Sequence, residues 1–524
     1  MGKKSEIETA SSDVVSARER IKSIDQLAAV ARAAREEGKT IVLAHGVFDL
    51  VHMGHTRHIE VAKKLGDILI VTVTADEYVN KGPGRPVFPE LLRAEMLGAF
   101  ACVDWCGVNH APTAENILEE IKPDIYVKGG DYADAEEDVT GKIVAEQEIV
   151  ESYGGRIVFT DEITFSSSEL INAHMAMHEP ETRAFIDEIR REEDAAPGVI
   201  SLIDSIADYR VLLIGETIID EYHYVTPMGM AAKESIIATR YQSCELFAGG
   251  VIAAANHVAG FCGGIEVVTC LGDNQAHEEV VREHLLPNVN LNVFRQENRP
   301  TICKRRYVDN LGLSKLFEIC YMDDKPISQE LSQKICDYLA AHAGDFDLVI
   351  VCDFGHGLMT QPVIEELVRC ARFLAVNAQS NSSNRGYNSV TKYPRADVIC
   401  IDEPEARLAV RDKHSDLQQI IAEELPAAID CDKFIVTYGN RGCLVWDYGN
   451  GVQHIPAFTH MPVDTIGAGD AFLSIASPLV AAGGTMRDVG FVGNIVGGIK
   501  VGIVGHRKSV DKASVKKSII GLLK

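Results

Sequence analysis

The sequence predicts an α/β protein of two doubly wound domains, each with a parallel sheet covered by helices on both faces. Two observations predict this fold class. Short apolar runs of strand length alternate with helical stretches in both halves of the 524-residue chain, which is the pattern of parallel sheets. The alternation stops once, over residues 174–204, where a charged helical stretch ends in Ala-Ala-Pro-Gly. That composition is typical of a linker.

The first half contains the shorter of the two predicted domains. Residues 1–23 are polar, and we expect a flexible N-terminus there. Residues 24–35 carry apolar side chains at helical spacing, which predicts a helix beside the first strand. Strands are expected at 41–45, 68–74, 124–128 and 156–160. The first predicted domain therefore covers residues 24–173.

The second predicted domain covers residues 205–524. It begins with an apolar strand that follows Arg210. Further apolar runs of strand length occur at 265–271, 347–353, 372–376, 397–401 and 433–437. Helical stretches separate these runs, so a second parallel sheet is expected.

The composition argues against several classes of protein. Hydrophobic residues make up 46% and charged residues 24% of the chain, as in folded globular proteins. The formal net charge of −25 argues against a nucleic-acid-binding surface, because such a surface needs a basic face. No apolar run approaches about 18 residues, so we expect no membrane span. The thirteen cysteines are dispersed and no signal peptide is found, which predicts reduced thiols and a cytoplasmic protein.

The first candidate site is the stretch Gly-Val-Phe-Asp-Leu-Val-His-Met-Gly-His, from Gly46 to His55. It connects an expected strand to an expected helix, whose unpaired first-turn N–H groups and positive end suit a phosphate. His52 and His55 are three residues apart and would project to one side. Imidazoles there can donate hydrogen bonds to a phosphate and stabilise charge that develops during its transfer. We therefore predict that both histidines are catalytic.

This stretch resembles the H-x-G-H signature of the cytidylyltransferase-like nucleotidyltransferases, and further motifs follow in the family's order up to residue 173. The string Lys-Gly-Gly-Asp-Tyr that begins at Lys128 is most similar to the adenylyltransferase half of the ADP-heptose synthases. Ser166 and Glu169 have the spacing of a capping box, so a second anion site is expected at that helix start. The resemblance implies a Rossmann-like fold. It also implies that nucleotide and phosphate are bound by Gly46, Phe48, Asp49, Lys81, Arg85, Arg93, Lys128, Ser166, Ser167 and Ser168.

The second candidate site is the turn Gly467-Ala468-Gly469-Asp470. A glycine-rich turn at a helix start directs several backbone N–H groups at one point, which suits the oxygens of a transferring phosphoryl group. A carboxylate just inside the turn can accept the proton of an attacking hydroxyl. The motif is common by itself, but related motifs occur along the whole second domain.

Together, these motifs resemble the ribokinase-like (PfkB) sugar kinases over residues 205–524. The resemblance implies a ribokinase-like fold with a small β lid, and it makes Asp470 the general base. It implies that the sugar is held by Asp220, Gly249, Gly250 and Asn256. It implies that ATP is held by Thr437, Gly439, Gly442, Gly467, Ala468, Gly469 and Asn494. Glu405 would act on the metal through water, with Asp402 beside it, and the metal would be the Mg²⁺ that accompanies ATP or NTP.

Three positions depart from the pattern of the kinases that the chain resembles. Where these kinases usually carry a lysine, this chain has Gln379, in the polar run from Asn377 to Asn384. Asp402 takes the place of the asparagine in their N-x-x-E motif, and His356 takes the place of a further lysine. Loss of a phosphate-facing cation costs on the order of a few kcal/mol of transition-state stabilisation. The order of the two domains is also the reverse of that in the common ADP-heptose synthases.

The two resemblances imply a bifunctional sugar-activating enzyme. The second domain would use ATP to phosphorylate a sugar phosphate of the heptose 7-phosphate class. The first would join a sugar 1-phosphate to a nucleoside monophosphate and release pyrophosphate, with ADP-heptose for lipopolysaccharide as the favoured product. A separate phosphatase would act between the two steps. We expect nucleotides and sugar phosphates as partners, and a homodimer through the lid at Tyr222–Glu245.

Three alternatives stay open. In the first, only the transferase is active and the kinase fold binds a sugar or forms the dimer, which Gln379, Asp402 and His356 motivate. In the second, the transferase uses CTP and a polyol or amino-alcohol phosphate. In the third, both halves are non-catalytic nucleotide-binding scaffolds, and the intact His52, His55 and Asp470 argue against it.

Overall fold

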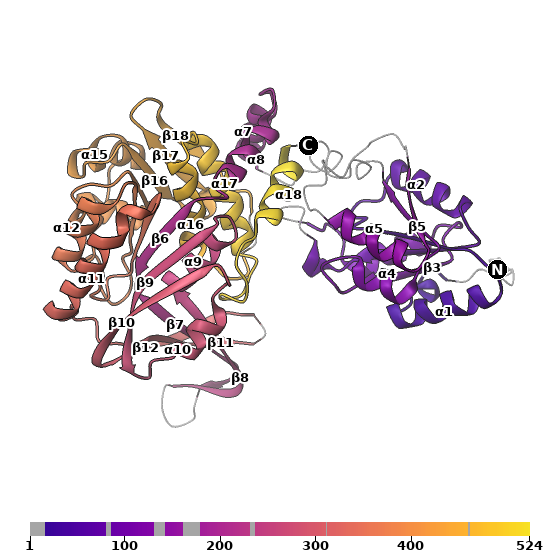
Figure 1. Cartoon of the computed structure of the whole chain (residues 1–524), viewed down its shortest axis with the longest axis horizontal. Coiled ribbons are helices and arrows are strands. Elements are labelled where there is room, and N and C mark those ends of the chain that lie inside the picture. Colours follow the sequence, from indigo (N-terminus) through magenta and orange to yellow (C-terminus); the bar gives the residue numbers. More distant parts are fainter. Residues whose placement is uncertain are drawn as a thin grey trace, which may run out of the picture. The chain divides into compact units, whose positions relative to one another are not determined.

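The computed structural model describes residues 16–79, 85–129, 142–160, 179–230, 236–310, 312–459 and 462–523. The chain forms two compact units, Met1–Met177 and His178–Leu523 (Figure 1). Each unit contains a mainly parallel sheet covered by helices on both faces, so the predicted fold class is confirmed.

The first unit has a five-stranded parallel sheet in the order β3-β2-β1-β4-β5. Its strands are β1 (Ile41–Gly46), β2 (Ile68–Thr74), β3 (Trp105–Asn109), β4 (Ile125–Gly129) and β5 (Arg156–Thr160). Its helices are α1 (Ile24–Glu36), α2 (Met53–Lys64), α3 (Glu90–Gly98), α4 (Glu115–Ile121) and α5 (Lys142–Ser152). Alternate residues of β1 belong to two separate cores, one shared with α2 and α3 and the other with α1 and α4. Both sheet faces are therefore buried, which explains the continuous apolar runs.

The second unit has a nine-stranded sheet in the order β10-β9-β6-β13-β14-β15-β16-β17-β18. These strands are β6 (Arg210–Gly215), β9 (Gly264–Asn274), β10 (Val289–Pro300), β13 (Leu348–Asp353), β14 (Leu374–Ala378), β15 (Val398–Asp402), β16 (Lys433–Thr437), β17 (Cys443–Asp447) and β18 (Gly451–Ile455). The strands are parallel from β10 to β16, and only β17 and β18 run antiparallel to their neighbours.

Two helical layers cover this sheet (Figure 1). One core includes α9 (Val251–Ala259), α16 (Ala468–Ala481), α17 (Met486–Lys500) and α18 (Lys512–Leu523). The opposite core includes α11 (Gln329–His342), α12 (Gln361–Cys370), α13 (Glu403–Val410) and α15 (Leu425–Ala428). The short helices α10 (Glu278–His284) and α14 (Leu417–Gln419) complete the layers.

A separate four-stranded sheet has the order β12-β11-β7-β8. Its strands are β7 (Thr217–Met230), β8 (Ile237–Gly250), β11 (Ile302–Asp309) and β12 (Lys315–Tyr321). β7 pairs antiparallel with β8 and parallel with β11. We call it the lid sheet, because the kinase resemblance implies a small β lid in this domain.

The stretch 174–204, whose composition predicts a linker, includes two helices of the second unit. These helices are α7 (Pro180–Arg190) and α8 (Ala195–Ser205). Ile186 and Ile203 lie in the same core as α9 and α16. Pro197 lies in the first turn of α8, where its missing N–H removes no helical hydrogen bond. The described part of the stretch therefore belongs to the second unit rather than to a linker.

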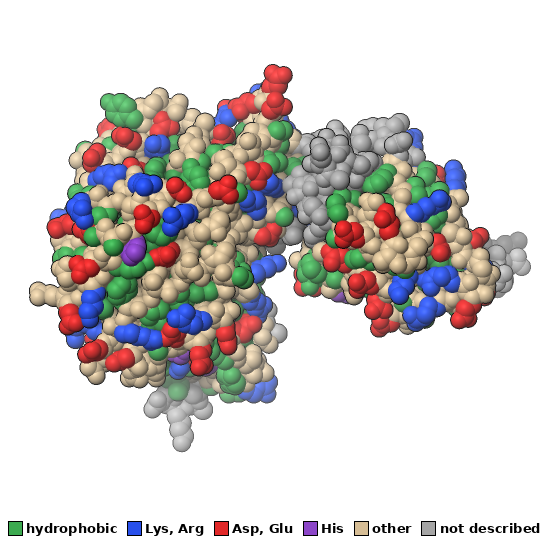
Figure 2. All heavy atoms as spheres, viewed as in Figure 1, with side chains coloured by type: hydrophobic (Ala, Val, Ile, Leu, Met, Phe, Trp, Pro, Cys, Tyr) green, Lys and Arg blue, Asp and Glu red, His purple; other side chains and the backbone are tan. Residues whose placement is uncertain are grey.

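The described surface is of mixed charge. Acidic and basic side chains are interspersed over the visible face of the second unit in Figure 2. Among the described residues, every helix is too short or too polar to cross a membrane.

Candidate active sites in the two units

The first site lies where the strand order reverses, at the carboxyl ends of β1 and β4. Open parallel sheets bind ligands at this point. His52 is the N-cap of α2, and its Nδ1 accepts a hydrogen bond of 3.1 Å from the Gly54 N–H. The His52 and His55 rings lie 4.0 Å apart between centroids. The structure therefore brings the two predicted catalytic histidines together at the helix start.

Phe48 supports this turn in a strained conformation. Its φ of 48° lies in the left-handed region, which bulky side chains avoid. Its side chain is buried, and its ring lies 5.2 Å from that of His55. Such strain persists only where surrounding contacts enforce it, and it concentrates at functional sites. Gly46, at the end of β1, leads into the turn.

Asp49 and Arg85 bind one another. Asp49 is almost fully buried and accepts hydrogen bonds from Arg85 Nη1 at 3.0 Å and from the Val87 N–H at 2.5 Å. The pair ties the segment after residue 84 to the turn that bears the histidines. Of the predicted phosphate-binding residues, Lys81, Ser166, Ser167 and Ser168 lie outside the described residues.

The environment of Arg93 differs from that of a phosphate-binding residue, which was its predicted role. Its side chain is fully buried, and Nε and Nη1 donate to the carbonyls of Phe88 and Val47. Nη2 donates to the Thr74 carbonyl at 2.7 Å and to Asp76 at 2.6 Å. Every guanidinium nitrogen is thus occupied by protein, so Arg93 positions the turn through the backbone of Val47.

Lys128 and His45 lie on neighbouring strands at the same sheet edge. Lys128 Nζ is 2.7 Å from Glu146 Oε2, and the pair is largely buried. Burial, and next the charge of Lys128, lower the pKa of His45 to about 3, so its imidazole is neutral. Its Nδ1 is 3.0 Å from Thr72 Oγ1. His45 was not predicted, although a histidine in an apolar strand was a usable signal.

The second site is centred on Asp470, in the first turn of α16. Burial raises the pKa of this carboxyl above its ordinary value. Gln379, from the end of β14, donates Nε2–H to Asp470 Oδ1 at 2.6 Å. Gln379, which stands where the related kinases carry a lysine, therefore holds the predicted general base through an uncharged donor.

The glycine turn before Asp470 needs its glycine. Gly467 is the N-cap of α16 with φ 75°, and Ala468 and Gly469 follow as the first helical residues. A Cβ at Gly467 would lie 2.6 Å from His506 Cε1. Lys500 donates Nζ hydrogen bonds to the Ile466 carbonyl at 2.7 Å and the Gly505 carbonyl at 2.9 Å. Lys500 thus fastens the segment that carries His506 to this turn.

Asp220 lies on the inner face of the lid and is buried. Burial alone would raise its pKa, but Arg306 and His506 beside it hold the pKa below the usual value. His506 Nε2 is 3.3 Å from Asp220 Oδ2. A Cβ at Gly249 would lie 2.1 Å from the same oxygen, and Gly250 has φ 62°. The structure therefore brings Asp220, Gly249 and Gly250 together, and their role in binding a sugar stays a prediction.

Arg306 and His506 were missed by sequence reasoning. Arg306 is 86 residues from Asp220 in the chain, and no local motif marks either residue. The side chain of His506 is 7% exposed, and among the described residues its buried Nδ1 has no hydrogen-bond partner. It therefore has an unused polar atom in the site.

Glu405 and Asp402 form a capping box at the start of α13. Glu405 N donates to Asp402 Oδ1, and Asp402 N donates to Glu405 Oε2, both at 2.8 Å. The Ser380 N–H donates to Glu405 Oε1 at 2.8 Å. Burial, and next the charge of Asp402, raise the pKa of Glu405 to about 8. Glu405 is thus held beside Gln379 and close enough to interact electrostatically with Asp470.

Thr437 lies beside Asp402, because β15 and β16 pair these residues. Gly439 and Gly442 form the turn that follows, with φ 60° and 92°. Asn494 donates Nδ2–H to the carbonyls of Ile455 and Pro456 at 2.9 and 3.1 Å. Its amide group therefore fixes the end of β18.

The side-chain amide of Asn256 makes its hydrogen bonds outside the predicted sugar site. Its Nδ2 donates to the His284 carbonyl at 2.7 Å, and its Oδ1 accepts from the Leu286 N–H at 3.0 Å. Both amide atoms thus anchor α9 to the chain after α10. The prediction rested on the resemblance to the PfkB kinases, and tertiary packing uses the amide elsewhere.

His356 lies in the tight turn after β13 and is 2% exposed. Its backbone N–H donates to Glu216 Oε1 at 3.0 Å. Burial, and next the charge of Lys304, lower its pKa to about 4. It is therefore a neutral group and does not replace the positive charge of a lysine.

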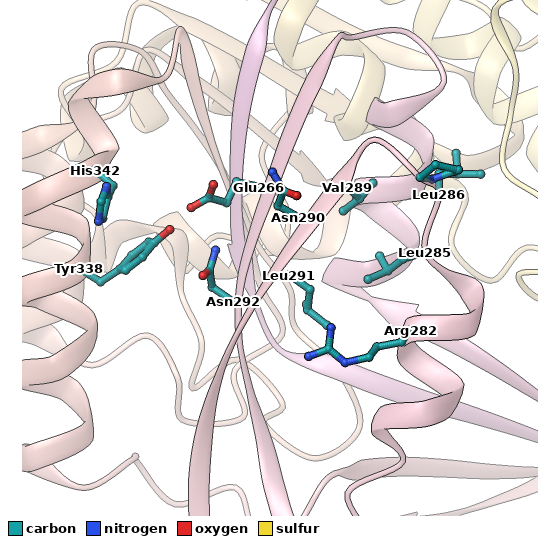
Figure 3. Close-up of a pocket in the computed structure, with 11 residues that line it drawn as sticks. Glu266, Arg282, Leu285, Leu286, Val289, Asn290, Leu291, Asn292, Tyr338 and His342 are labelled. Atoms are coloured by element: carbon teal, nitrogen blue, oxygen red, sulfur yellow. The ribbon is translucent and has the colours of Figure 1, made fainter.

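A hollow of about 820 Å³ lies along β10 and is lined by residues that include Glu266, Arg282, Tyr338 and His342 (Figure 3). The lining residues include none of the predicted site residues. The hollow is therefore not lined by the catalytic candidates of the second unit.

Two family models match this chain, one in each of the two units. Residues 209–513 match the model of the pfkB family of carbohydrate kinases, and residues 43–173 match the cytidylyltransferase-like model. The bifunctional protein HldE of Syntrophotalea carbinolica is 39% identical over 144 residues, which are 27% of this chain and 28% of that protein. The bifunctional protein HldE of Citrifermentans bemidjiense is 26% identical over 312 residues, which are 59% of this chain and 63% of that protein. The matched part is thus less than two thirds of each relative.

A solved structure of a putative ribokinase from Agrobacterium tumefaciens is 16% identical to this chain, with a TM-score of 0.48. The match covers 60% of this chain and 98% of that one.

Proposed function

Because the chain belongs to the pfkB family of carbohydrate kinases, we propose that its second unit transfers a phosphoryl group from ATP to a hydroxyl of a sugar phosphate. The observation that carries this proposal is the buried Asp470 carboxylate at the start of α16, held by Gln379 at 2.6 Å. We propose that the first unit transfers a nucleotidyl group from an NTP to a sugar 1-phosphate and releases pyrophosphate.

In the kinase reaction, Asp470 accepts the proton of the attacking hydroxyl. Burial strengthens it as a base, since it raises the pKa. The N–H groups at the Gly467 turn stabilise the charge on the phosphoryl oxygens. Asp220 accepts hydrogen bonds from other sugar hydroxyls, and Arg306 keeps it ionised.

The residues present fit Mg²⁺. A hard cation prefers oxygen ligands and retains several waters. Glu405 and Asp402 supply side-chain oxygens, and Glu405 lies close enough to Asp470 to interact with it electrostatically. Each side-chain carboxyl oxygen of Glu405 accepts one hydrogen bond from a backbone N–H, which leaves lone pairs for water held by the ion. Mg²⁺ that arrives with ATP would neutralise charge on the phosphates.

In the nucleotidyl transfer, His52 and His55 stabilise the charge on the α-phosphate and the leaving pyrophosphate. His45, which is neutral, orders the floor of the site through Thr72. The Lys-Gly-Gly-Asp-Tyr string favours a sugar phosphate of the heptose class and ADP-heptose as the product. If the kinase product carries two phosphates, a separate phosphatase must act between the steps. The thirteen free cysteines favour the cytoplasm as the place of reaction.

The two activities are tested together. The protein is incubated with each NTP and candidate sugar phosphates, and release of ADP and of pyrophosphate is followed separately. We expect Asp470→Asn to lower only sugar-dependent ADP release, and His55→Ala to lower only pyrophosphate release. The bifunctional proposal is overturned if the wild-type protein forms only one of these products with every acceptor.

A second function for the kinase unit is binding without catalysis. The specific observation that favours it is Gln379, which contacts Asp470 without supplying a positive charge. Sugar phosphate binding without ADP formation in the same assay would identify this function.

We also infer a homodimer through the lid. The side chains of Phe317, Ile319, Tyr321 and Tyr241 are 46%, 39%, 37% and 59% exposed. Exposed apolar side chains gathered on one sheet mark an interaction surface. Light scattering should show a dimer at micromolar concentration, and Phe317→Asp should shift it towards the monomer. A monomeric wild-type protein would reject the inference.

A further inference from the structure

The lid sheet has a second face that the kinase reaction does not use. Successive residues of a strand point to opposite faces. Asp220 points towards His506, and the Tyr222 hydroxyl donates to Asp464 at 3.0 Å, so this face borders the kinase site. Glu221 and His223 therefore point to the other face. Cys244 of β8 is the direct register partner of His223.

The three side chains on this face converge. His223 Nε2 is 2.8 Å from Glu221 Oε1, and Cys244 Sγ is 3.8 Å from the same oxygen. All three donor atoms lie within 4.8 Å of one another. A second thiol is close, since Cys303 Sγ is 3.6 Å from Glu221 Oε2.

We propose that Glu221, His223 and Cys244 form a binding site for a divalent transition-metal ion of the Zn²⁺ class. One thiolate, one imidazole and one carboxylate are the donor types that Zn²⁺ takes. Ca²⁺ and Mg²⁺ take oxygen ligands almost entirely, so this set selects against them. The site is on the opposite face of the lid from Asp220 and does not depend on kinase activity.

A contact outside the ligand set orients the Glu221 carboxylate. A bound divalent ion takes the Cys244 thiol as thiolate, with release of its proton. Arg305 Nε holds Glu221 Oε2 at 2.7 Å. This contact orients the carboxylate from outside the ligand set and leaves Oε1 directed at His223 and Cys244.

A metal ion here would join the two strands that pair most extensively in the lid. His223 lies on β7, which carries Asp220, and Cys244 lies on β8, which carries Gly249. The ion would therefore stabilise the strand pair from which two sugar-site candidates project. Its ligands also lie beside the aromatic side chains of Tyr241 and Tyr307.

The test uses the full-length protein, freed of metal by a chelator and then titrated with Zn²⁺ by calorimetry and with Co²⁺ by absorption. We expect one ion per chain and a thiolate-to-cobalt charge-transfer band. Cys244→Ser and His223→Ala should each remove the band and weaken Zn²⁺ binding by about 10-fold or more. Cys320→Ser is the matched control, because it removes another partly exposed lid thiol, which contacts Glu318 at 3.2 Å.

Circular dichroism establishes that each variant is folded. Cys244 is exposed, so its replacement by serine leaves the core intact. The proposal is overturned if the wild-type protein shows no saturable one-to-one binding. It is also overturned if folded Cys244→Ser and His223→Ala bind Zn²⁺ as the wild type does, or if Cys320→Ser removes the band.

Discussion

Replacement of Asp470 by asparagine is the sharpest perturbation of the proposed kinase. Asparagine has the same shape, and its side-chain oxygen can still accept the hydrogen bond that Gln379 donates at 2.6 Å. It cannot take a proton from the sugar hydroxyl. A positioned general base contributes about 10²–10⁴-fold, which is about 3–5 kcal/mol of activation free energy. Because burial raises the pKa of Asp470 and so its basicity, we expect a loss in the upper part of this range.

The assay follows sugar-dependent ADP release at saturating ATP and sugar phosphate, with pyrophosphate release as the internal reference. Asp488→Asn is the matched control, since Asp488 also lies in the first turn of a helix but outside the site. Kinase turnover in Asp470→Asn within 10-fold of the wild type would refute the assignment of the base. An equal loss in both activities would instead indicate general misfolding.

Four further outcomes are expected. The kinase rate should fall as the pH falls through the raised pKa of Asp470. Gln379→Met should move this decline to higher pH, because the substitution removes a hydrogen bond that favours the carboxylate. A pH–rate profile of the wild type and the variant checks both expectations. His55→Ala should lower pyrophosphate release by about 10²-fold or more, and release at the wild-type rate from a folded variant would remove the histidine from the mechanism. Gly467→Ala would place a Cβ 2.6 Å from His506 Cε1 and should lower kinase turnover by about 10²-fold. Gly483→Ala is the control: Gly483 also has a positive φ, of 83°, but a Cβ there would meet open space, so kinase turnover should not fall. Light scattering should report a dimer that Phe317→Asp weakens.

The candidate sites were predictable where their chemistry is local in the chain. The turn with His52 and His55 and the turn from Gly467 to Asp470 each lie within about ten residues, and glycine, helix start and reactive side chain occur in one string. The main strands were predictable because both faces of each sheet are buried, which makes the runs continuously apolar. β3 was not predicted, since its five residues include a glycine and an asparagine.

The tertiary structure decided which side chains meet. Gln379 and Asp470 are 91 residues apart, and Asp220 meets Arg306 and His506 only because the lid and the chain after α17 approach the same point. Folding also directed Arg93, Asn256 and Asn494 to backbone groups. The type of a residue defines which hydrogen bonds and ion pairs its side chain can make. The sequence by itself therefore determined these bonding possibilities and the local turns. Which partner lies within about 3 Å depends on the packing of distant segments, and only the folded chain decides that.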